Sequence, residues 1–381
     1  MEPAYFDHNA TTPLDDGVFE AMLPYLKGEY GNASSRHEFG TRARKAVNQA
    51  RERVARLVNV QASQVVFVSG GTEANNLFIK GAAAYLKPTQ VVVSGIEHPC
   101  IAKPAQDLAR QGWKLRKLAV RPDGLVDLAD VDAALTNATG LVSVMLANNE
   151  TGVIQPVAEI AAKAREKRAW MHTDAVQALG KIPVNFESLG VHAMTISAHK
   201  IYGPKGAGAL VVDKRLELKP IIHGGGHEMG LRSGTENVPA IVGFGAACEL
   251  AQERMDQISG HLQALRDRAD QGVSAVGALI FGQGAPRIPN TTYFAVPNID
   301  GETLVIELDK AGFAVASGAA CSSTSTEPSA TLLAMGVAPE LARGAVRVSF
   351  GVQNTAGQVE DFLQALSAVL NRLRRLTAIA V

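Results

Sequence analysis

The chain has 381 residues, of which 46% are hydrophobic and 19% are charged. Basic and acidic side chains number 37 each, so no net charge favours nucleic acid or an anionic membrane as a direct partner. No uncharged apolar run approaches the roughly 20 residues of a membrane span, and the N-terminus lacks the pattern of a secretory signal. We therefore expect a cytoplasmic protein, and its length favours two or three domains.

Helical and strand patterns alternate along the first two thirds of the chain. The helix-like stretches are 42–57, 73–86, 103–110 and 157–167, and the strand-like runs are 65–68, 90–93, 141–146, 170–173, 193–197 and 209–212. The strand runs are continuously apolar and rich in β-branched residues, which is typical of strands buried on both faces. This pattern predicts an α/β domain with a parallel or mostly parallel sheet.

The last third of the chain has a different pattern. A long helix is predicted over 246–269, with one apolar face that could connect two domains. Beyond it we expect strands near 291–296 and 345–350 and helices near 301–311 and 359–373, an α+β arrangement. The predicted division is a large α/β domain over 15–257 and a small α+β domain formed by 1–14 and 258–381.

Ligands of open α/β sheets bind beyond the carboxyl ends of the strands, so the residues that follow the apolar runs are candidates for a site. Gly71 and Thr72 lead into a helix whose N-terminus could hold a phosphate. His98, Asn149 and Asp174 follow three other runs. Each feature also has a purely structural interpretation, as a helix cap, a structural histidine or a turn residue.

Lys200 lies three residues after Ser197, which ends the apolar run 193–197. Lysines are usually exposed, yet burial would lower the pKa of the amine and free it for Schiff-base chemistry. Asp174, at the end of another strand, would need a cationic partner, and the protonated ring nitrogen of pyridoxal phosphate is one. Lys200 and Asp174 together fit that cofactor, although Lys205 rivals Lys200 on chemistry alone.

Nine motifs in order, spanning about Tyr5 to Gly351, resemble the pyridoxal-phosphate cysteine desulfurases of the class V aminotransferase family, in their NifS/IscS-like branch. They are 9–13, 69–73, 97–98, 148–152, His172-Thr173-Asp174-Ala175-Val176-Gln177, Ser197-Ala198-His199-Lys200, 223–228, 232–237 and 316–323. The resemblance implies the fold of the fold-type I pyridoxal-phosphate transferases. It also implies conversion of L-cysteine to L-alanine with transfer of the sulfur to an enzyme persulfide, for iron–sulfur cluster assembly or other sulfur-transfer pathways.

The same resemblance implies roles for individual residues. Lys200 would form the Schiff base and move protons, Asp174 would pair with the ring nitrogen, and His98 would stack on the ring. The full set of implied cofactor contacts is Gly71, Thr72, His98, Asn149, Asp174, Gln177, Ser197, His199, Lys200 and Thr235. Because Thr235 would reach the phosphate of a neighbouring subunit, a homodimer is implied. Arg347 would clamp the substrate carboxylate, with Asn149 and Asn32 as further substrate contacts.

The three cysteines are far apart in the sequence, which argues against a disulfide framework. Cys321 is the expected persulfide-forming nucleophile, because its segment, about 316–328, is rich in small and polar residues and is expected to be a mobile loop. Cys248 is expected in a helix core, and a redox role for Cys100 stays open. No metal is expected, because the glycines between His223 and His227 disfavour a helical ligand pair.

Two alternatives remain at this stage. One is an aminotransferase or selenocysteine lyase with the same fold, in which Cys321 would be dispensable. The other is a catalytically silent scaffold that binds sulfur-transfer proteins. An iron–sulfur scaffold or another sulfur acceptor is the expected protein partner, but no motif indicates which.

Overall fold

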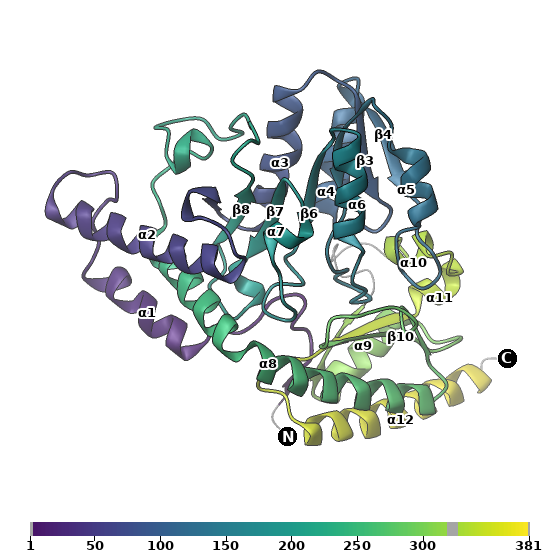
Figure 1. Cartoon of the computed structure of the whole chain (residues 1–381). Helices are drawn as coiled ribbons and strands as arrows, with labels where there is room; N and C mark the ends of the chain where they lie inside the picture. The colour runs from purple at the N-terminus through teal and green to yellow at the C-terminus, as the bar shows by residue number, and fades with distance from the viewer. Residues whose placement is uncertain (1–2, 318–326, 380–381) are drawn as a thin grey trace.

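The computed structural model describes residues 3–317 and 327–379, with side chains as far as residue 375. Two sheets lie one above the other in Figure 1, the larger in the upper part of the view and the smaller in the lower part. Helix α8 (Val238–Ala275) runs beneath the large sheet and continues along the small one. None of the helices among these residues is long and apolar enough to cross a membrane.

The large sheet has seven strands in the order β2-β8-β7-β6-β5-β3-β4. The strands from β7 to β4 run parallel, whereas β8 is antiparallel to both of its neighbours, so the predicted mostly parallel sheet is confirmed. Its strands are β2 (Val65–Val68), β3 (Gln90–Ser94), β4 (Lys114–Leu118), β5 (Thr139–Ser143), β6 (Trp170–Asp174), β7 (Ala193–Ser197) and β8 (Gly208–Val212).

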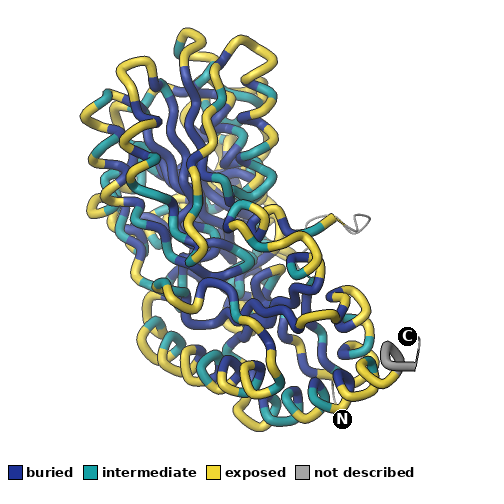
Figure 2. Tube along the Cα trace, turned by 90° about the vertical axis from the view of Figure 1, so that its right-hand side faces the viewer, coloured by how far each residue is buried: buried dark blue, intermediate teal, exposed yellow. Residues whose placement is uncertain are grey.

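Helices cover both faces of this sheet because successive strand residues point to opposite sides. Val65 packs in a core with α1, α2, α6 and the first half of α8, whereas Val66 packs in a second core with α3 and α4. Figure 2 shows the strands buried between partly exposed helices. The helices are α1 (Asp16–Lys27), α2 (Glu38–Leu57), α3 (Gly71–Tyr85), α4 (Pro99–Arg110), α5 (Leu128–Ala134), α6 (Val157–Glu166) and α7 (Phe186–Leu189).

The smaller sheet is antiparallel, with the order β12-β13-β10-β9, and β1 pairs with β11 beside it. Its core includes residues of α8, α9 and α12. The elements are β1 (Ala4–Tyr5), β9 (Leu279–Ile280), β10 (Thr291–Ala295), α9 (Gly301–Lys310), β11 (Phe313–Ala314), β12 (Ala316–Ser317), α10 (Ala330–Ala334), α11 (Pro339–Arg343), β13 (Ala345–Ser349) and α12 (Ala356–Ile379).

Helix α8 belongs to both cores. Its buried residues up to Ala251 join the core of the large sheet, and those from Leu262 onward join the core of the small one. The helix starts at Val238, eight residues before the predicted start at 246. Residues 240–248 are buried on every side, so they lack the amphipathic period from which a helix is predicted. The domain division at residue 257 stays a prediction, and it would fall between the two buried parts of α8.

Candidate active site

A cavity of about 400 Å³ lies beyond the carboxyl ends of the parallel strands, with its other wall formed by the N-terminal segment and β13. This volume is in the usual range for a small-molecule site. The predicted site residues that line it are Gly71, Thr72, His98, Asn149, Asp174, Gln177, Ser197, His199, Lys200 and Arg347. The structure therefore brings together residues from the ends of several strands of the large sheet and from the small sheet.

One end of the cavity offers donors for an anion. Helix α3 begins at Gly71, and its N-cap residue Gly70 provides no side-chain cap for the first turn. The Ser197 hydroxyl is buried and has no partner among the described residues. A Cβ on Gly71 would come within 3.1 Å of Val176 Cγ2, so the backbone lies close to the cavity wall there. An uncapped helix N-terminus beside a free hydroxyl can accept a phosphate group.

Asp174 ends β6 and is only 6% exposed. Its Oδ2 accepts a hydrogen bond from Asn75 Nδ2 at 2.7 Å, and its Oδ1 accepts one from the Val176 backbone N–H at 3.0 Å. These donors stabilise the carboxylate without neutralising it. A negative charge held at the edge of the cavity suits a cationic ring nitrogen.

Lys200 lies at the end of a short 3-10 helix, Ala198–Lys200, that follows β7 directly. Its Nζ donates to the backbone carbonyls of Asn9 at 2.5 Å and Ala10 at 2.6 Å, and the side chain is partly buried. Lys205 is exposed and does not line the cavity. Of the two lysines that sequence chemistry left open, only Lys200 is at the site.

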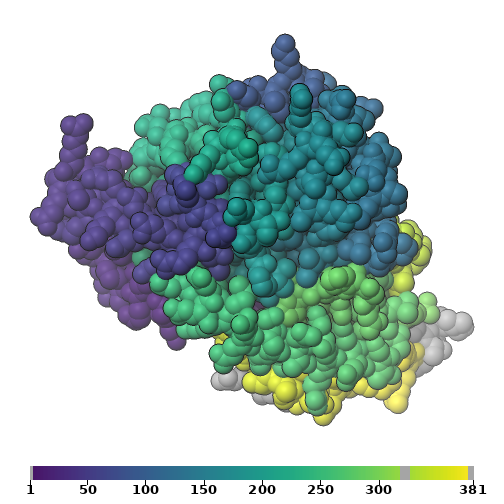
Figure 3. Space-filling view, in the orientation of Figure 1, coloured from purple at the N-terminus to yellow at the C-terminus, as the bar shows by residue number. Residues whose placement is uncertain are grey.

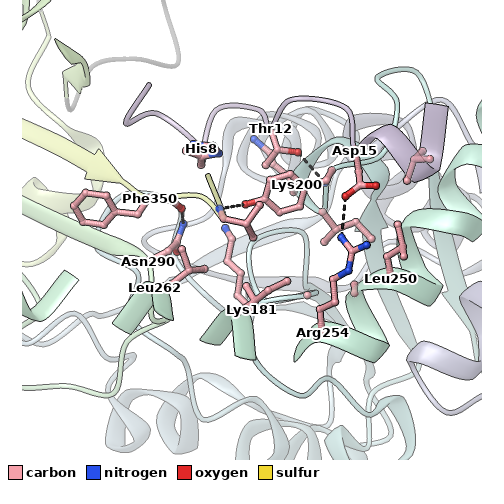
Figure 4. A pocket seen from close by; sticks show the side chains of 17 residues that line it. His8, Thr12, Asp15, Lys181, Lys200, Leu250, Arg254, Leu262, Asn290 and Phe350 are labelled. Atoms are coloured by element: carbon pink, nitrogen blue, oxygen red, sulfur yellow. Dashed lines mark hydrogen bonds and ion pairs between the residues drawn. The ribbon is translucent and has the colours of Figure 1, made fainter. Parts of the chain in front are cut away.

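Lys200 also borders a second, narrower cavity, which Figure 4 shows from close by. Its free volume of about 30 Å³ is enough for roughly one water molecule. Lys181 lines this cavity, and its Nζ donates to Gln177 Oε1 at 2.8 Å and Asn9 Oδ1 at 3.1 Å. Burial, with the charges of Lys200 and Arg347, holds the pKa of Lys181 well below its usual value. Lys181 therefore supports Gln177 and Asn9 through these two donated hydrogen bonds.

His98 is the N-cap of α4, and its Nδ1 accepts the Cys100 backbone N–H at 3.2 Å. Burial lowers the pKa of His98, against the opposing effect of the Asp174 charge. Cys100 Sγ lies 2.8 Å from the same Nδ1. Burial and the Asp174 charge raise the pKa of the Cys100 thiol to about 12. The pair is therefore a neutral ring beside a protonated thiol.

Arg347 lies in β13, on the wall opposite the strand ends. Its Nη2 donates to Asp7 Oδ1 at 2.7 Å and its Nη1 donates to the Asn149 carbonyl at 2.9 Å. Its Nε is buried and has no partner among the described residues. A guanidinium with donors at the cavity can bind a carboxylate bidentately, in competition with Asp7.

Two predicted site residues of the described part of the chain, Thr235 and Asn32, do not line this cavity. Thr235 is exposed and lines a different pocket, and Asn32 is exposed in a turn where its Oδ1 accepts the Ser34 N–H at 2.9 Å. Cys321 lies outside the described residues. Cys248 is fully buried in α8, as its sequence context predicted.

Sequence reasoning assigned no role to several residues that the structure places at the site. Asp7, Asn9, Ala10 and Cys100 line the cavity, and Asn75 donates hydrogen bonds to Asp174 and Cys100. Asn9 belongs to a motif of the family resemblance, 9–13, which was the one available signal. In the described part of the chain, no group of three or more histidine, cysteine or acidic side chains could hold a metal ion.

The residues of the cavity fit pyridoxal phosphate. The α3 end with the unpartnered Ser197 hydroxyl suits its phosphate, Asp174 suits its ring nitrogen, and Lys200 suits its aldehyde carbon. A family model, "Aminotransferase class-V", matches residues 4–362. The fold and the site thus define a pyridoxal-phosphate enzyme of this class.

Individual proteins similar to this chain narrow the class further. The cysteine desulfurase IscS of Dictyoglomus turgidum is 42% identical over 379 residues, 98% of this chain and 96% of that protein. A solved structure described as a NifS-like protein is 37% identical, with a TM-score of 0.92 over 97% of this chain and 99% of that one. SspA in complex with cysteine is 31% identical, with a TM-score of 0.80 over 91% of this chain and 98% of that one. This chain belongs to the aminotransferase class-V family, among its pyridoxal-phosphate-dependent cysteine desulfurases.

Proposed function

We propose that the cavity converts L-cysteine to L-alanine and passes the sulfur to Cys321 as a persulfide. One observation carries this proposal: Lys200, Asp174 and the uncapped end of α3 surround one cavity, and Arg347 faces it from the small domain. The first three suit the cofactor, and the fourth suits an amino-acid carboxylate. The relative named as a cysteine desulfurase and the solved structure of SspA in complex with cysteine support the choice of substrate.

When bound, pyridoxal phosphate withdraws electrons from the Cα of an attached amino acid. Thr72, Ser197 and His199 would hold its phosphate, and Asp174 would keep its ring nitrogen protonated. Burial and the positive charges of Lys200 and Lys205 lower the pKa of His199 to about 4, so His199 is neutral at physiological pH and acts as a hydrogen-bonding group. Gln177, supported by Lys181, would contact the phenolic oxygen.

The protein's own groups would move the protons. The Lys200 amine would remove the Cα proton of the substrate, a general-base task. His98, a neutral imidazole on the cavity wall, would stack on the ring and assist proton transfer. Arg347 and Asn149 would fix the substrate carboxylate, so that the Cα proton faces Lys200.

The sulfur step balances as a transfer to a thiol. The Cβ–S bond of cysteine breaks and an S–S bond to Cys321 forms, the electron pair of the broken bond stays with the carbon skeleton, and Cβ takes up the proton that the Cys321 thiol gives up, so that alanine leaves. The described residues on both sides of 318–326 support this role, because they contact residues of the cavity wall or next to it. Ala316 pairs with Arg347 across the small sheet, and Thr331 Oγ1 donates to Glu150 at 2.8 Å, one residue from Asn149.

A homodimer is part of the proposal. Thr235 is exposed and turned to a pocket other than its own active-site cavity, which supports a role in a partner's site. Apolar side chains are exposed around α1 and α2, the purple elements at the left edge of Figure 3. Tyr30 is 78% exposed and stacks on Phe39, and Phe19 and Leu26 of α1 are also exposed. Exposed apolar groups of this kind are typical of protein–protein interfaces.

For the destination of the sulfur we propose iron–sulfur cluster assembly in the cytoplasm, with a scaffold or carrier protein as acceptor. The support is the name of the relative from Dictyoglomus turgidum, a cysteine desulfurase of the IscS type. Two unpaired cysteines, Cys100 and Cys248, suit a reducing compartment.

The test is to incubate the cofactor-loaded protein with L-cysteine and a thiol reductant and to measure alanine and sulfide. We expect equal amounts of both products, and almost none of either from the Cys321→Ser variant. Cys248→Ala serves as a matched thiol control and should remain active. Full activity of Cys321→Ser on cysteine would disprove the nucleophile, and activity that requires an α-keto acid would indicate an aminotransferase instead.

A further inference from the structure

We infer that Asn75 and Cys100 are positioning residues that hold His98 in one tautomer, with the ring proton on Nε2. The inference rests on the proposed role of His98 at the cofactor site. Its first step is the contact between the Cys100 backbone N–H and His98 Nδ1, at 3.2 Å. A backbone N–H can only donate, so Nδ1 offers its lone pair in this contact, but at 3.2 Å the bond is long and by itself only favours the neutral ring with its proton on Nε2.

The Cys100 side chain strengthens the same assignment. Its Sγ lies 2.8 Å from His98 Nδ1. The thiol keeps its hydrogen, since burial and the charge of Asp174 raise its pKa to about 12. Because Nδ1 is an acceptor, the S–H donates to it. A protonated thiol is also a poor nucleophile, so Cys100 is not a second acceptor for the substrate sulfur.

Asn75 sets the direction of the thiol hydrogen. Its Nδ2 donates to Asp174 Oδ2 at 2.7 Å and to Cys100 Sγ at 2.9 Å. The carboxylate of Asp174 only accepts, so the amide must present its NH₂ group there, and that group has a hydrogen for each contact. The sulfur thus receives one hydrogen and directs its own to His98.

The resulting chain runs in one direction, from Asn75 through Cys100 to His98. It connects Asp174 and His98, the two groups proposed to contact the ring nitrogen and the ring face of the cofactor. Asn75 has no solvent exposure, and its Oδ1 has no partner among the described residues. The buried amide is therefore held by its two donated bonds alone, and its rotation would break both. His98 Nε2 remains as the ring's donor at the cavity.

The experiment is NMR of the full-length, cofactor-loaded protein with ¹⁵N-labelled histidine, with His98→Gln used to assign the ring signals. We expect the wild type to show the Nε2–H tautomer and Cys100→Ala to show a mixture of tautomers. Cys100→Ser retains a donor and should restore the single tautomer. Cys248→Ala, which removes a buried thiol from α8, should leave the His98 signals unchanged.

Activity gives a second readout. Loss of one hydrogen bond to His98 should lower kcat about five-fold in Cys100→Ala with little change in KM, and Cys100→Ser should recover most of the loss. If Cys100→Ala does not fold, Asn75→Ala tests the same chain from its other end and should also give mixed tautomers. A single Nε2–H tautomer in both variants, or an Nδ1–H tautomer in the wild type, would overturn the inference. Absence of alanine from the wild type would instead refute the proposed function, because the NMR result does not depend on turnover.

Discussion

The two walls of the active-site cavity are built in different ways. On one wall, His98, Asp174 and Lys200 each stand at or just after the end of their own strand. On the other wall, Arg347 of β13 is paired with Asp7, from 340 positions earlier in the chain. The strand-end wall follows from local sequence and sheet topology, whereas the opposite wall exists only once the small sheet has packed against the N-terminal segment.

The walls also differ in their electrostatics. On the strand-end wall, the charged Asp174 is held by two hydrogen-bond donors of the protein, Asn75 Nδ2 and the Val176 N–H. The opposite wall presents a cation that is shared between Asp7 and a backbone carbonyl, with its Nε still available. We therefore expect substitutions on the first wall to remove chemistry and substitutions on the second to alter substrate binding.

The largest expected effect is at the strand-end wall. Lys200→Ala removes the only lysine that lines the cavity among the described residues, so alanine formation should fall by about 1,000-fold or more even with added pyridoxal phosphate. The matched control is Lys205→Ala, which removes an exposed lysine five residues away and should stay within about two-fold of the wild type. Comparable losses in both variants would mean that the choice between the lysines is wrong.

At the opposite wall, which contains Arg347, we expect smaller effects on KM for L-cysteine, with opposite signs in two variants. Arg347→Lys loses the guanidinium fork, so kcat/KM for L-cysteine should fall about 10- to 100-fold, mainly through KM. Asp7→Asn removes the carboxylate that competes for Arg347 and should lower KM a few-fold. Steady-state kinetics at saturating cofactor measure both. A rise in KM for Asp7→Asn would show that Asp7 orients Arg347 rather than competing for it.

The smallest expected effect concerns a buried histidine of β6, the strand that ends at Asp174. His172 of β6 is fully buried, stacked on Phe78, and burial lowers its pKa to about 3. The unfolded chain binds a proton at His172 below pH about 6.5, so this contribution to stability is complete above that pH and is lost as the pH falls toward 3. Between pH 5.5 and 4, the free energy of unfolding of His172→Gln should depend less steeply on pH, by about 1.4 kcal/mol per pH unit. Urea unfolding of the cofactor-free proteins measures both slopes, and equal slopes would contradict the assignment.

Strands with a strong apolar pattern could be predicted from the sequence. An exposed edge strand and a helix that contains proline were missed. Strands β2 and β7 lie at their predicted residues because both of their faces are buried. Strand β4, Lys114–Leu118, was missed because it lies at the edge of the sheet and three of its five residues are exposed. Helix α1 was also missed, since it contains Pro24, which is unfavourable in a helix interior.

The same contrast holds for the site. The sequence by itself determined the α/β class and the strand-end residues Gly71, His98, Asp174 and Lys200, because a residue that ends a parallel strand comes to the same edge as its equivalents on the neighbouring strands. It could not separate Lys200 from Lys205 by chemistry alone. The family motif Ser197-Ala198-His199-Lys200 favoured Lys200, and in the structure Lys200 lines the cavity whereas Lys205 is exposed and does not.

Contacts between distant segments were decided by the tertiary structure alone. The pairing of Asp7 with Arg347, the support of Asn9 by Lys181, and the chain from Asn75 to His98 join residues whose types carry no signal of their partners. Hydrogen bonds of this kind depend on distances of a few tenths of an ångström, whereas sequence patterns record only which face of an element is apolar. Local motifs therefore indicate the reaction class, but the hydrogen-bond partners of His98 and Arg347 are set by tertiary packing.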